Sequence, residues 1–209
     1  MVTKDFAKKV AEKSQADTWV PAKEHSVFNS YDASYYEGHR EAFIHKYRVL
    51  KNATALLEPE SIVELGSSHG PGTNAMLTGV DWKASYVGYD SYGPTTNEQG
   101  EPWDPVVIMK SMFQANSFEK YNLEMCDLRQ VESIPEADLC FVDAMHDYRG
   151  CYQDTLLAIR AECKHILIDD YHGEEVKFAV EDICNNYRDE VRQVCYLEHL
   201  SGLVLLERI

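Results

Sequence analysis

The sequence predicts an α/β domain with a doubly wound, mostly parallel sheet that includes an antiparallel last strand. Short apolar runs closed by an acid alternate with segments of helical periodicity, which is the pattern of βαβ units. The last two apolar runs, Val191 to Leu197 and Leu203 to Glu207, lie too close together for a crossover helix, so we expect them to pair antiparallel. Such sheets bind ligands at the carboxyl ends of their strands, where the acids stand.

The other elements follow the same alternation along the chain. The apolar runs expected to form parallel strands are 61–65, 86–89, 123–126, 139–142 and 166–168. Spacing at i, i+3 and i+4 predicts helices over 35–57, around 73–77, over 148–163 and over 176–187. Because no repeat or linker is present, we expect residues 1–209 to form one domain, with 1–57 as a helical substrate or lid region and 58–209 as the core.

The composition limits the partners. Net charge is −15, from 35 acidic and 20 basic residues. A surface this acidic repels the phosphates of nucleic acids and of anionic membranes, so we expect a small-molecule substrate and neither of those partners. No apolar run long enough for a membrane span and no apolar signal segment occurs, and the six cysteines form no CxxC pair. We therefore expect a cytoplasmic protein with reduced cysteines. Assembly into a homo-oligomer is a further possibility that the composition leaves open.

A glycine-rich turn, IVELGSSHGPGT over residues 62–73, joins an apolar strand to a helix. Gly66 permits a tight turn, and Gly70 lets the backbone approach a ligand. Glu64 stands where a carboxylate can receive an ammonium group, and Asp90 closes the next strand, where an acid can accept both hydroxyls of a ribose. The alternative is an ordinary tight turn with capping acids, but the coincidence of these residues favours a ligand.

A second group of acids follows two neighbouring strands. Asp143 ends the run LCFVD, and Asp169 and Asp170 end the run HILIDD. Adjacent strands lie about 4.8 Å apart, so these carboxylates can converge, and either a divalent cation or lysine and arginine partners would relieve their repulsion. Mg²⁺ prefers carboxylate oxygens and water, so the three acids are the predicted metal ligands. Helix capping is the alternative, above all for Asp170.

Histidines near these acids are candidates for a general base. His146 comes first, because an imidazole that titrates near neutral pH can take a hydroxyl proton. A histidine satisfied by the core or by a local cap is the alternative interpretation. His69, inside the glycine-rich turn, and His172 are lesser candidates.

Two aromatic-rich segments could border the site. Residues 91–105 (SYGPTTNEQGEPWDP) lack apolar periodicity and are predicted to form a lid, with Tyr92 and Trp103 able to contact a ligand; a solvated loop is the alternative. Near the N-terminus, a cluster of aromatic residues could wall a pocket, although packing against the sheet is the favoured interpretation for most of them. These residues are Phe28, Tyr31, Tyr35 and Tyr36.

Together these segments resemble the class I S-adenosylmethionine (SAM)-dependent methyltransferases. VELGSSHG is similar to the family's first motif, YVGYD to its ribose-binding strand end, and EMCDL places Asp127 at its adenine-side acid. The resemblance runs from about Ile62 to the C-terminus and implies a seven-stranded Rossmann-like sheet, SAM as cofactor, and methyl transfer to a nucleophile. The cofactor-binding residues are expected to be Glu64, Gly66, Ser68, His69, Gly70, Asp90, Ser91 and Asp127.

The second acid group resembles more narrowly the macrocin-type and cephalosporin hydroxylase-related O-methyltransferases, and more distantly catechol O-methyltransferase. In these enzymes the acid after strand four and two acids after strand five hold Mg²⁺, which here implies Asp143, Asp169 and Asp170. Met145 stands where the sugar enzymes often carry a second acid, and their usual Gly-Gly before strand five is absent. The segment VDAMHDYRGCYQD resembles theirs at Asp143, His146, Tyr148 and Asp154.

The sequence therefore predicts Mg²⁺-dependent O-methylation of a small-molecule hydroxyl, on a natural product, a sugar or a catechol-like diol, with Asp143 and His146 in catalysis. Other functions remain open. They are a metal-free N- or O-methyltransferase whose acids bind an amine, a nicotinamide oxidoreductase on the same fold, and a catalytically silent SAM-binding protein. The oxidoreductase is disfavoured because the turn lacks the third glycine of the dinucleotide fingerprint and follows an acid.

Overall fold

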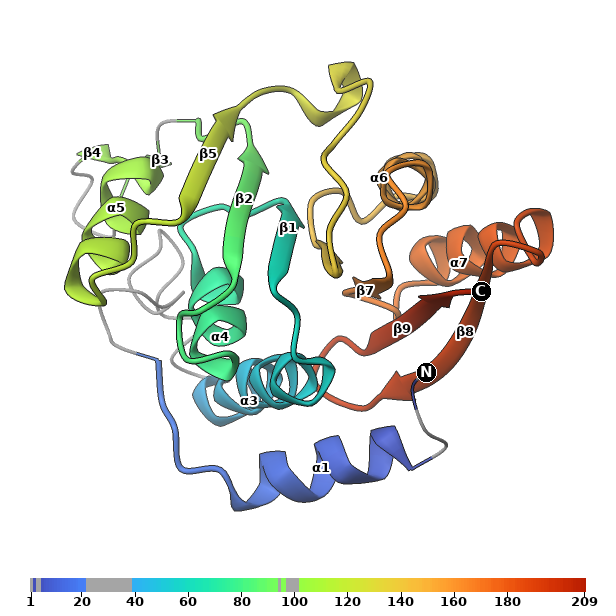
Figure 1. The fold of residues 1–209 in the computed structure, drawn as a ribbon, viewed down its shortest axis with the longest axis horizontal. Helices are drawn as coiled ribbons and strands as arrows, with labels where there is room; N and C mark the ends of the chain where they lie inside the picture. The colour runs from blue at the N-terminus through green and yellow to red at the C-terminus, as the bar shows by residue number, and fades with distance from the viewer. Residues whose placement is uncertain (1, 3–4, 22–38, 94, 97–101) are drawn as a thin grey trace.

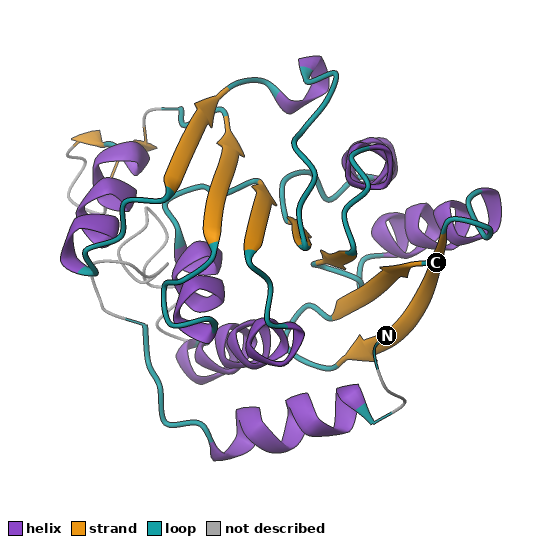
Figure 2. Ribbon diagram, in the orientation of Figure 1, coloured by secondary structure: helices purple, strands orange, loops and turns teal. Residues whose placement is uncertain are grey.

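A seven-stranded sheet forms the centre of the computed structural model, which describes residues 2, 5–21, 39–93, 95–96 and 102–209 (Figures 1 and 2). Its strand order is β5-β2-β1-β6-β7-β9-β8. The strands are β1 (Ser61–Leu65), β2 (Ser85–Asp90), β5 (Tyr121–Met125), β6 (Leu139–Val142), β7 (His165–Ile168), β8 (Val191–Leu197) and β9 (Leu203–Arg208).

Strands joined by long connections run parallel, and the two strands joined by a short turn run antiparallel. β5, β2, β1, β6 and β7 pair in parallel, whereas β9 lies between β7 and β8 and is antiparallel to both. A short turn joins β8 to β9, which leaves no room for a crossover helix. The predicted fold class, including the antiparallel last strand, is confirmed.

Helices cover the two faces of the sheet. One face carries α1 (Phe6–Ala16), α3 (Arg40–Leu57), α4 (Pro71–Gly79) and α5 (Pro105–Ala115), and the other carries α6 (Tyr148–Arg160) and α7 (Glu174–Asn186). Alternate residues of β6 divide between these layers: Leu139 and Phe141 pack in the first core, and Cys140 and Val142 pack in the second. This two-sided burial explains why the parallel strands are continuous apolar runs.

Several helices begin at recognisable caps. The Asp104 carboxylate accepts the N–H groups of Val106 and Val107 at the start of α5, and Asp147 accepts the N–H of Gly150 at the start of α6. By contrast, α7 begins after Gly173 without a side-chain cap, so Asp170 is not its capping residue. The structure therefore does not support the capping interpretation of Asp170.

Some elements differ from the prediction. No helix was predicted over residues 105–115, although Asp104 followed by Pro105 is a helix-start signal. In the lid segment, the short strands β3 (Thr95–Thr96) and β4 (Pro102–Trp103) pair with each other, while residues 94 and 97–101 lie outside the described residues. A 3₁₀ turn, η3 (Leu128–Gln130), follows β5. Among the described residues, no helix is both long and apolar enough to cross a membrane.

Candidate active site

Two adjoining pockets open at the carboxyl ends of β1, β2, β6 and β7. The first, of about 580 Å³, is lined by Asp90, Ser91 and Asp127, among others. The second, of about 510 Å³, is lined by side chains from β1, α3 and the segments that follow β6 and β7. The residues common to both linings are Gly66, Ser68 and Asp143. The predicted cofactor residues and the predicted catalytic residues therefore border one continuous region.

The backbone of the glycine-rich turn is left-handed at two glycines. Gly66 forms the predicted tight turn, whereas Gly70 lines neither pocket and instead lies against Met109 and Met112 of α5. Gly66 has φ 94° and Gly70 has φ 90°, a region that side chains disfavour. A Cβ on Gly66 would lie 2.5 Å from the Cα of Ala144 and 2.5 Å from the carbonyl oxygen of Asp143. The absence of a side chain at Gly66 therefore lets the turn pack directly against the end of β6, where the two pockets adjoin.

Asp90 holds the loops that border the first pocket. Its carboxylate accepts the N–H of Ser68 at 2.8 Å and the N–H of Tyr92 at 2.8 Å. Tyr92 is buried, and its hydroxyl is hydrogen-bonded to Ser67 Oγ at 2.6 Å. Tyr92 thus supports the glycine-rich turn, whereas the lid prediction for its neighbours falls partly on residues outside the described part of the chain.

Asp127 and His69 also line the pockets, but each is engaged by a neighbour. Arg129 binds the Asp127 carboxylate through two hydrogen bonds of 2.8 Å, and these bonds lower the pKa of Asp127. His69 is buried, and its Nδ1 is hydrogen-bonded to Ser68 Oγ at 3.0 Å. Both residues therefore have local roles that the sequence did not reveal.

Glu64 is a buried carboxylate with one oxygen bound by two hydroxyls. Its Oε2 accepts from Thr73 Oγ1 at 2.5 Å and from the Tyr86 hydroxyl at 2.6 Å. Burial raises the pKa of Glu64 to about 7, against the lowering effect of these two donors. The residue lines the second pocket, so a cation entering there meets a carboxylate that ionises near neutral pH.

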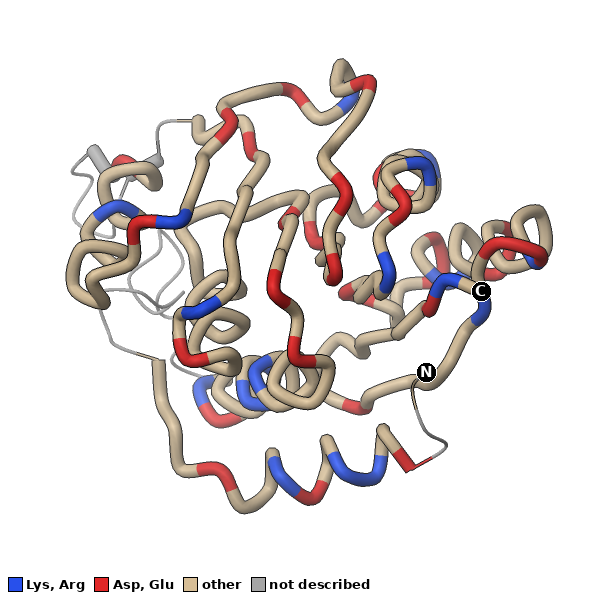
Figure 3. Tube along the Cα trace, in the orientation of Figure 1, with Lys and Arg blue, Asp and Glu red and all other residues tan. Residues whose placement is uncertain are grey.

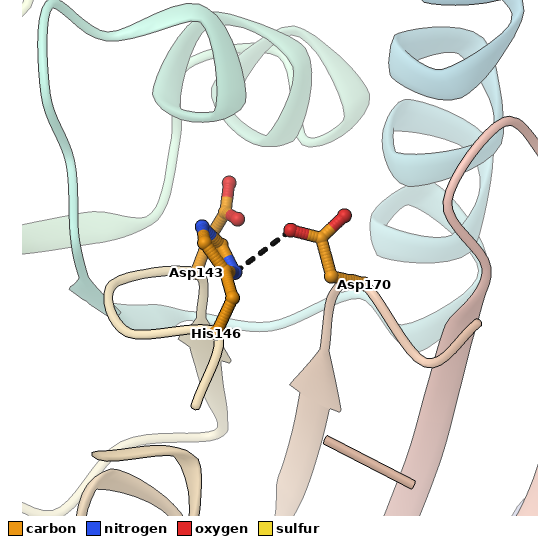
Figure 4. Close-up of side chains that lie close together, drawn as sticks. All are labelled: Asp143, His146 and Asp170. Atoms are coloured by element: carbon orange, nitrogen blue, oxygen red, sulfur yellow. Dashed lines mark ion pairs between the residues drawn. The ribbon is translucent and has the colours of Figure 1, made fainter. Parts of the chain in front are cut away.

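The acids after β6 and β7 have separate partners. Asp143, His146 and Asp170 each offer a ligand atom within 4.8 Å of the others, and Figure 4 shows the three side chains converging. His146 Nδ1 lies 2.7 Å from Asp170 Oδ2. This hydrogen bond raises the pKa of His146.

The two acids of this group have opposite pKa shifts. Burial opposes the ionisation of Asp170, but His146 and Lys46 lower the pKa of Asp170 to about 2. Burial, reinforced by Asp169 and opposed by Lys46, raises the pKa of Asp143.

Asp169 lies outside that group of three. It is 2% exposed, its Oδ2 forms an ion pair with Lys46 Nζ, and its Oδ1 accepts a hydrogen bond from Ser201 Oγ at 3.1 Å. His199 Nε2 lies 3.6 Å from the same Oδ1, and burial lowers the pKa of His199 to about 4. The structure therefore does not gather Asp143, Asp169 and Asp170 into the predicted ligand set.

Sequence analysis missed Lys46. This residue lies on α3 and lines the second pocket together with Phe43 and Tyr47. Burial alone would lower the pKa of Lys46, but the charges of Asp169 and Asp143 hold it well above its usual value. A signal was present, because a lysine that stands in the apolar stripe of a predicted helix needs a buried partner.

Apart from Met145, the other residues of interest lie away from the two pockets or outside the described residues. His172 is hydrogen-bonded to the Tyr196 hydroxyl, and the Tyr148 hydroxyl donates to Asp182 at 2.7 Å. Asp154 is buried on α6, where burial raises its pKa to about 7. Met145 is exposed and lines the first pocket. The aromatic residues Phe28, Tyr31, Tyr35 and Tyr36 lie outside the described residues, as does the side chain of Trp103.

Comparison with solved structures identifies the fold. The chain is similar to SAH-bound methyltransferase PaMTH1 of Podospora anserina, with 15% identity, a TM-score of 0.60, and coverage of 100% of this chain and 97% of that one. The O-methyltransferase TomG of Streptomyces achromogenes, involved in tomaymycin synthesis and solved with SAM, gives 11% identity, a TM-score of 0.58, and coverage of 100% and 99%. A methyltransferase from Geobacter sulfurreducens gives 16% identity, a TM-score of 0.58, and coverage of 86% and 90%.

The chain has the Rossmann-like methyltransferase fold. No family model matches the chain, and no curated protein matches it in sequence. At these levels of identity the likeness concerns the fold, and the chemistry has to be argued from the site itself.

Proposed function

We propose that this chain is a SAM-dependent methyltransferase that methylates a hydroxyl of a small molecule. The observation that carries the proposal is the junction of the two pockets, where the glycine-rich turn meets Asp143. Acids suited to SAM border this junction on one side, and the His146–Asp170 pair borders it on the other. A methyl donor and a hydroxyl acceptor held in these pockets would meet at one place.

Residues of both pockets suit the charges and hydroxyls of SAM. In the first pocket, Asp90 would accept the ribose hydroxyls. In the second pocket, Glu64 would receive the ammonium group with the carboxylate oxygen that Thr73 and Tyr86 leave open. Ser91 and Asp127, which line the same pocket as Asp90, would contact the nucleoside part of SAM. When bound, SAM supplies a methyl group activated by its sulfonium.

His146 is the proposed base. A proton on its Nδ1, donated to Asp170, fixes the imidazole and leaves Nε2 to accept the proton of the acceptor hydroxyl. The side chain is 53% exposed, so an acceptor can reach it. Asp143, at the junction, would orient the hydroxyl by accepting a hydrogen bond before transfer.

A metal-assisted form of this reaction is the second candidate. It is favoured by the convergence of Asp143, His146 and Asp170, which is compatible with a divalent cation such as Mg²⁺ or a softer ion. A cation there would make the acceptor hydroxyl more acidic. The predicted set with Asp169 does not fit, because Lys46 and Ser201 already bind that carboxylate.

A small-molecule acceptor is proposed over a nucleic acid on grounds of charge. The chain carries a net charge of −15, and acidic positions are spread over most of its elements, although α1 and α3 carry more basic than acidic residues (Figure 3). Nucleic-acid binding needs a basic surface instead. The fold itself does not select the acceptor.

Calorimetry and turnover test this function. The wild type should bind SAM and not NAD, and Asp90→Ala should weaken SAM binding at least tenfold, because a charged acceptor of ribose hydroxyls is lost. Asp189→Ala, on an exposed residue that lines neither pocket, is the control. Transfer of labelled methyl from SAM should then be measured over a panel of small hydroxyl and amine compounds. Absence of SAM binding by the wild type would refute the proposal.

A further inference from the structure

Three carboxylates crowd the carboxyl ends of β6 and β7, and their charges need compensation. Asp169 is the most deeply buried of them, with 2% exposure. An ionised carboxylate at such a position is tolerated only when it is paired and hydrogen-bonded. The identity of the compensating cation therefore decides how the site works.

Lys46 provides this compensation from another layer of the molecule. Its ammonium pairs with Oδ2 of Asp169, and the lysine side chain is 13% exposed. The other oxygen, Oδ1, receives the hydrogen bond of Ser201 and faces His199. Because Lys46 and Ser201 engage one oxygen each, a metal at Asp169 would compete with the Lys46 ammonium for the same carboxylate.

The neighbouring acid is paired in the same way. His146 lies 2.7 Å from Asp170, which gives the cluster a second internal partner. A divalent cation bound by Asp143 and Asp170 would have to displace this imidazole or share it, and it would also meet the ammonium of Lys46. Repulsion between the divalent cation and this ammonium opposes metal binding.

We propose that Lys46 takes the place of a divalent cation in this active site, so that methyl transfer proceeds without a metal. The part about turnover rests on the proposed function, whereas the part about metal exclusion does not. Lys46 acts as a positioning residue: it balances the charge of Asp169 and holds the pocket-lining residues Phe43 and Tyr47 of α3 against the ends of the strands.

The first test is a titration with Mn²⁺, followed by its electron paramagnetic resonance spectrum, with Mg²⁺ as competitor. The wild type should show no site tighter than millimolar, with or without SAM. Lys46→Gln should bind Mn²⁺ at least tenfold more tightly than the wild type, because Asp169 loses its ammonium partner. Lys46→Arg, which keeps the charge, should behave like the wild type.

Lys51→Gln is the matched control. Lys51 lies on the same helix and pairs with Asp17 at 2.7 Å, also in a partly buried position, but it lines neither of the two pockets. This variant should leave both Mn²⁺ binding and methyl transfer unchanged. It separates a charge effect at the site from a general loosening of α3.

The second test is turnover once an acceptor is known. Exhaustive chelation should leave the wild-type rate unchanged, and Lys46→Gln should lower kcat at least tenfold while SAM affinity changes less than twofold. Micromolar Mn²⁺ binding by the wild type, loss of its activity on chelation, or no gain of Mn²⁺ binding by Lys46→Gln would each overturn the inference. Failure of the wild type to bind SAM would refute the proposed function instead, and the Mn²⁺ result would still stand.

Discussion

Glu64 gives a stability prediction that does not depend on any ligand. The side chain is 1% exposed, and burial raises its pKa from 4.5 to about 7. The folded state therefore holds a proton between these pH values that the unfolded state has released. The resulting stability is fully present below pH 4.5 and is lost as pH rises to about 7.

The size of this loss follows from the change in pKa. A rise from 4.5 to about 7 corresponds to about 3 kcal/mol, at ~1.4 kcal/mol per pH unit. About 2 kcal/mol of it falls between pH 5.5 and pH 8. Glu64→Gln keeps the shape of the side chain and never ionises, so the variant should lack this decline.

Urea denaturation of both proteins at pH 5.5 and pH 8 measures the effect. The wild type should lose about 2 kcal/mol of unfolding free energy relative to Glu64→Gln over this range. Bound SAM should reverse this loss of stability at higher pH, because its ammonium favours the ionised Glu64 carboxylate. For the same reason, the affinity of the wild type for SAM should rise up to about tenfold between pH 6 and pH 8. Parallel pH profiles for the two proteins would show that the Glu64 carboxyl is not protonated in the folded state.

Two further predictions concern the turn and the surface. Gly66→Ala should cost about 2 kcal/mol or more of unfolding free energy, because the added Cβ would lie 2.5 Å from Ala144 at a φ of 94°; Gly93→Ala, where a Cβ meets nothing within 4 Å, should change it by less than about 0.5 kcal/mol. Equal thermal or urea stability of the two variants would contradict this. Because the net charge is −15, fluorescence anisotropy at low salt should show no binding of RNA or DNA, and micromolar affinity would contradict the small-molecule proposal.

Features set by local sequence were predicted correctly. Gly66 adopts the positive φ of the tight turn predicted there, and the apolar runs form the expected parallel strands. The antiparallel placement of β9 followed from the short connection after β8. In each case a few adjacent residues contain the physical information, through backbone sterics, chain length or alternation of burial.

Features that join distant segments were decided by the tertiary structure alone. The sequence placed Asp143, Asp169 and Asp170 near one another, but it did not reveal that Lys46 comes from α3 to bind Asp169 or that His146 binds Asp170. Pairing of charges depends on which side chains arrive within a few ångströms of one another, and one chain's residue pattern does not encode that distance. The sequence therefore predicted where the candidate site lies, and the packing of α3 against the strand ends determined which charges it contains.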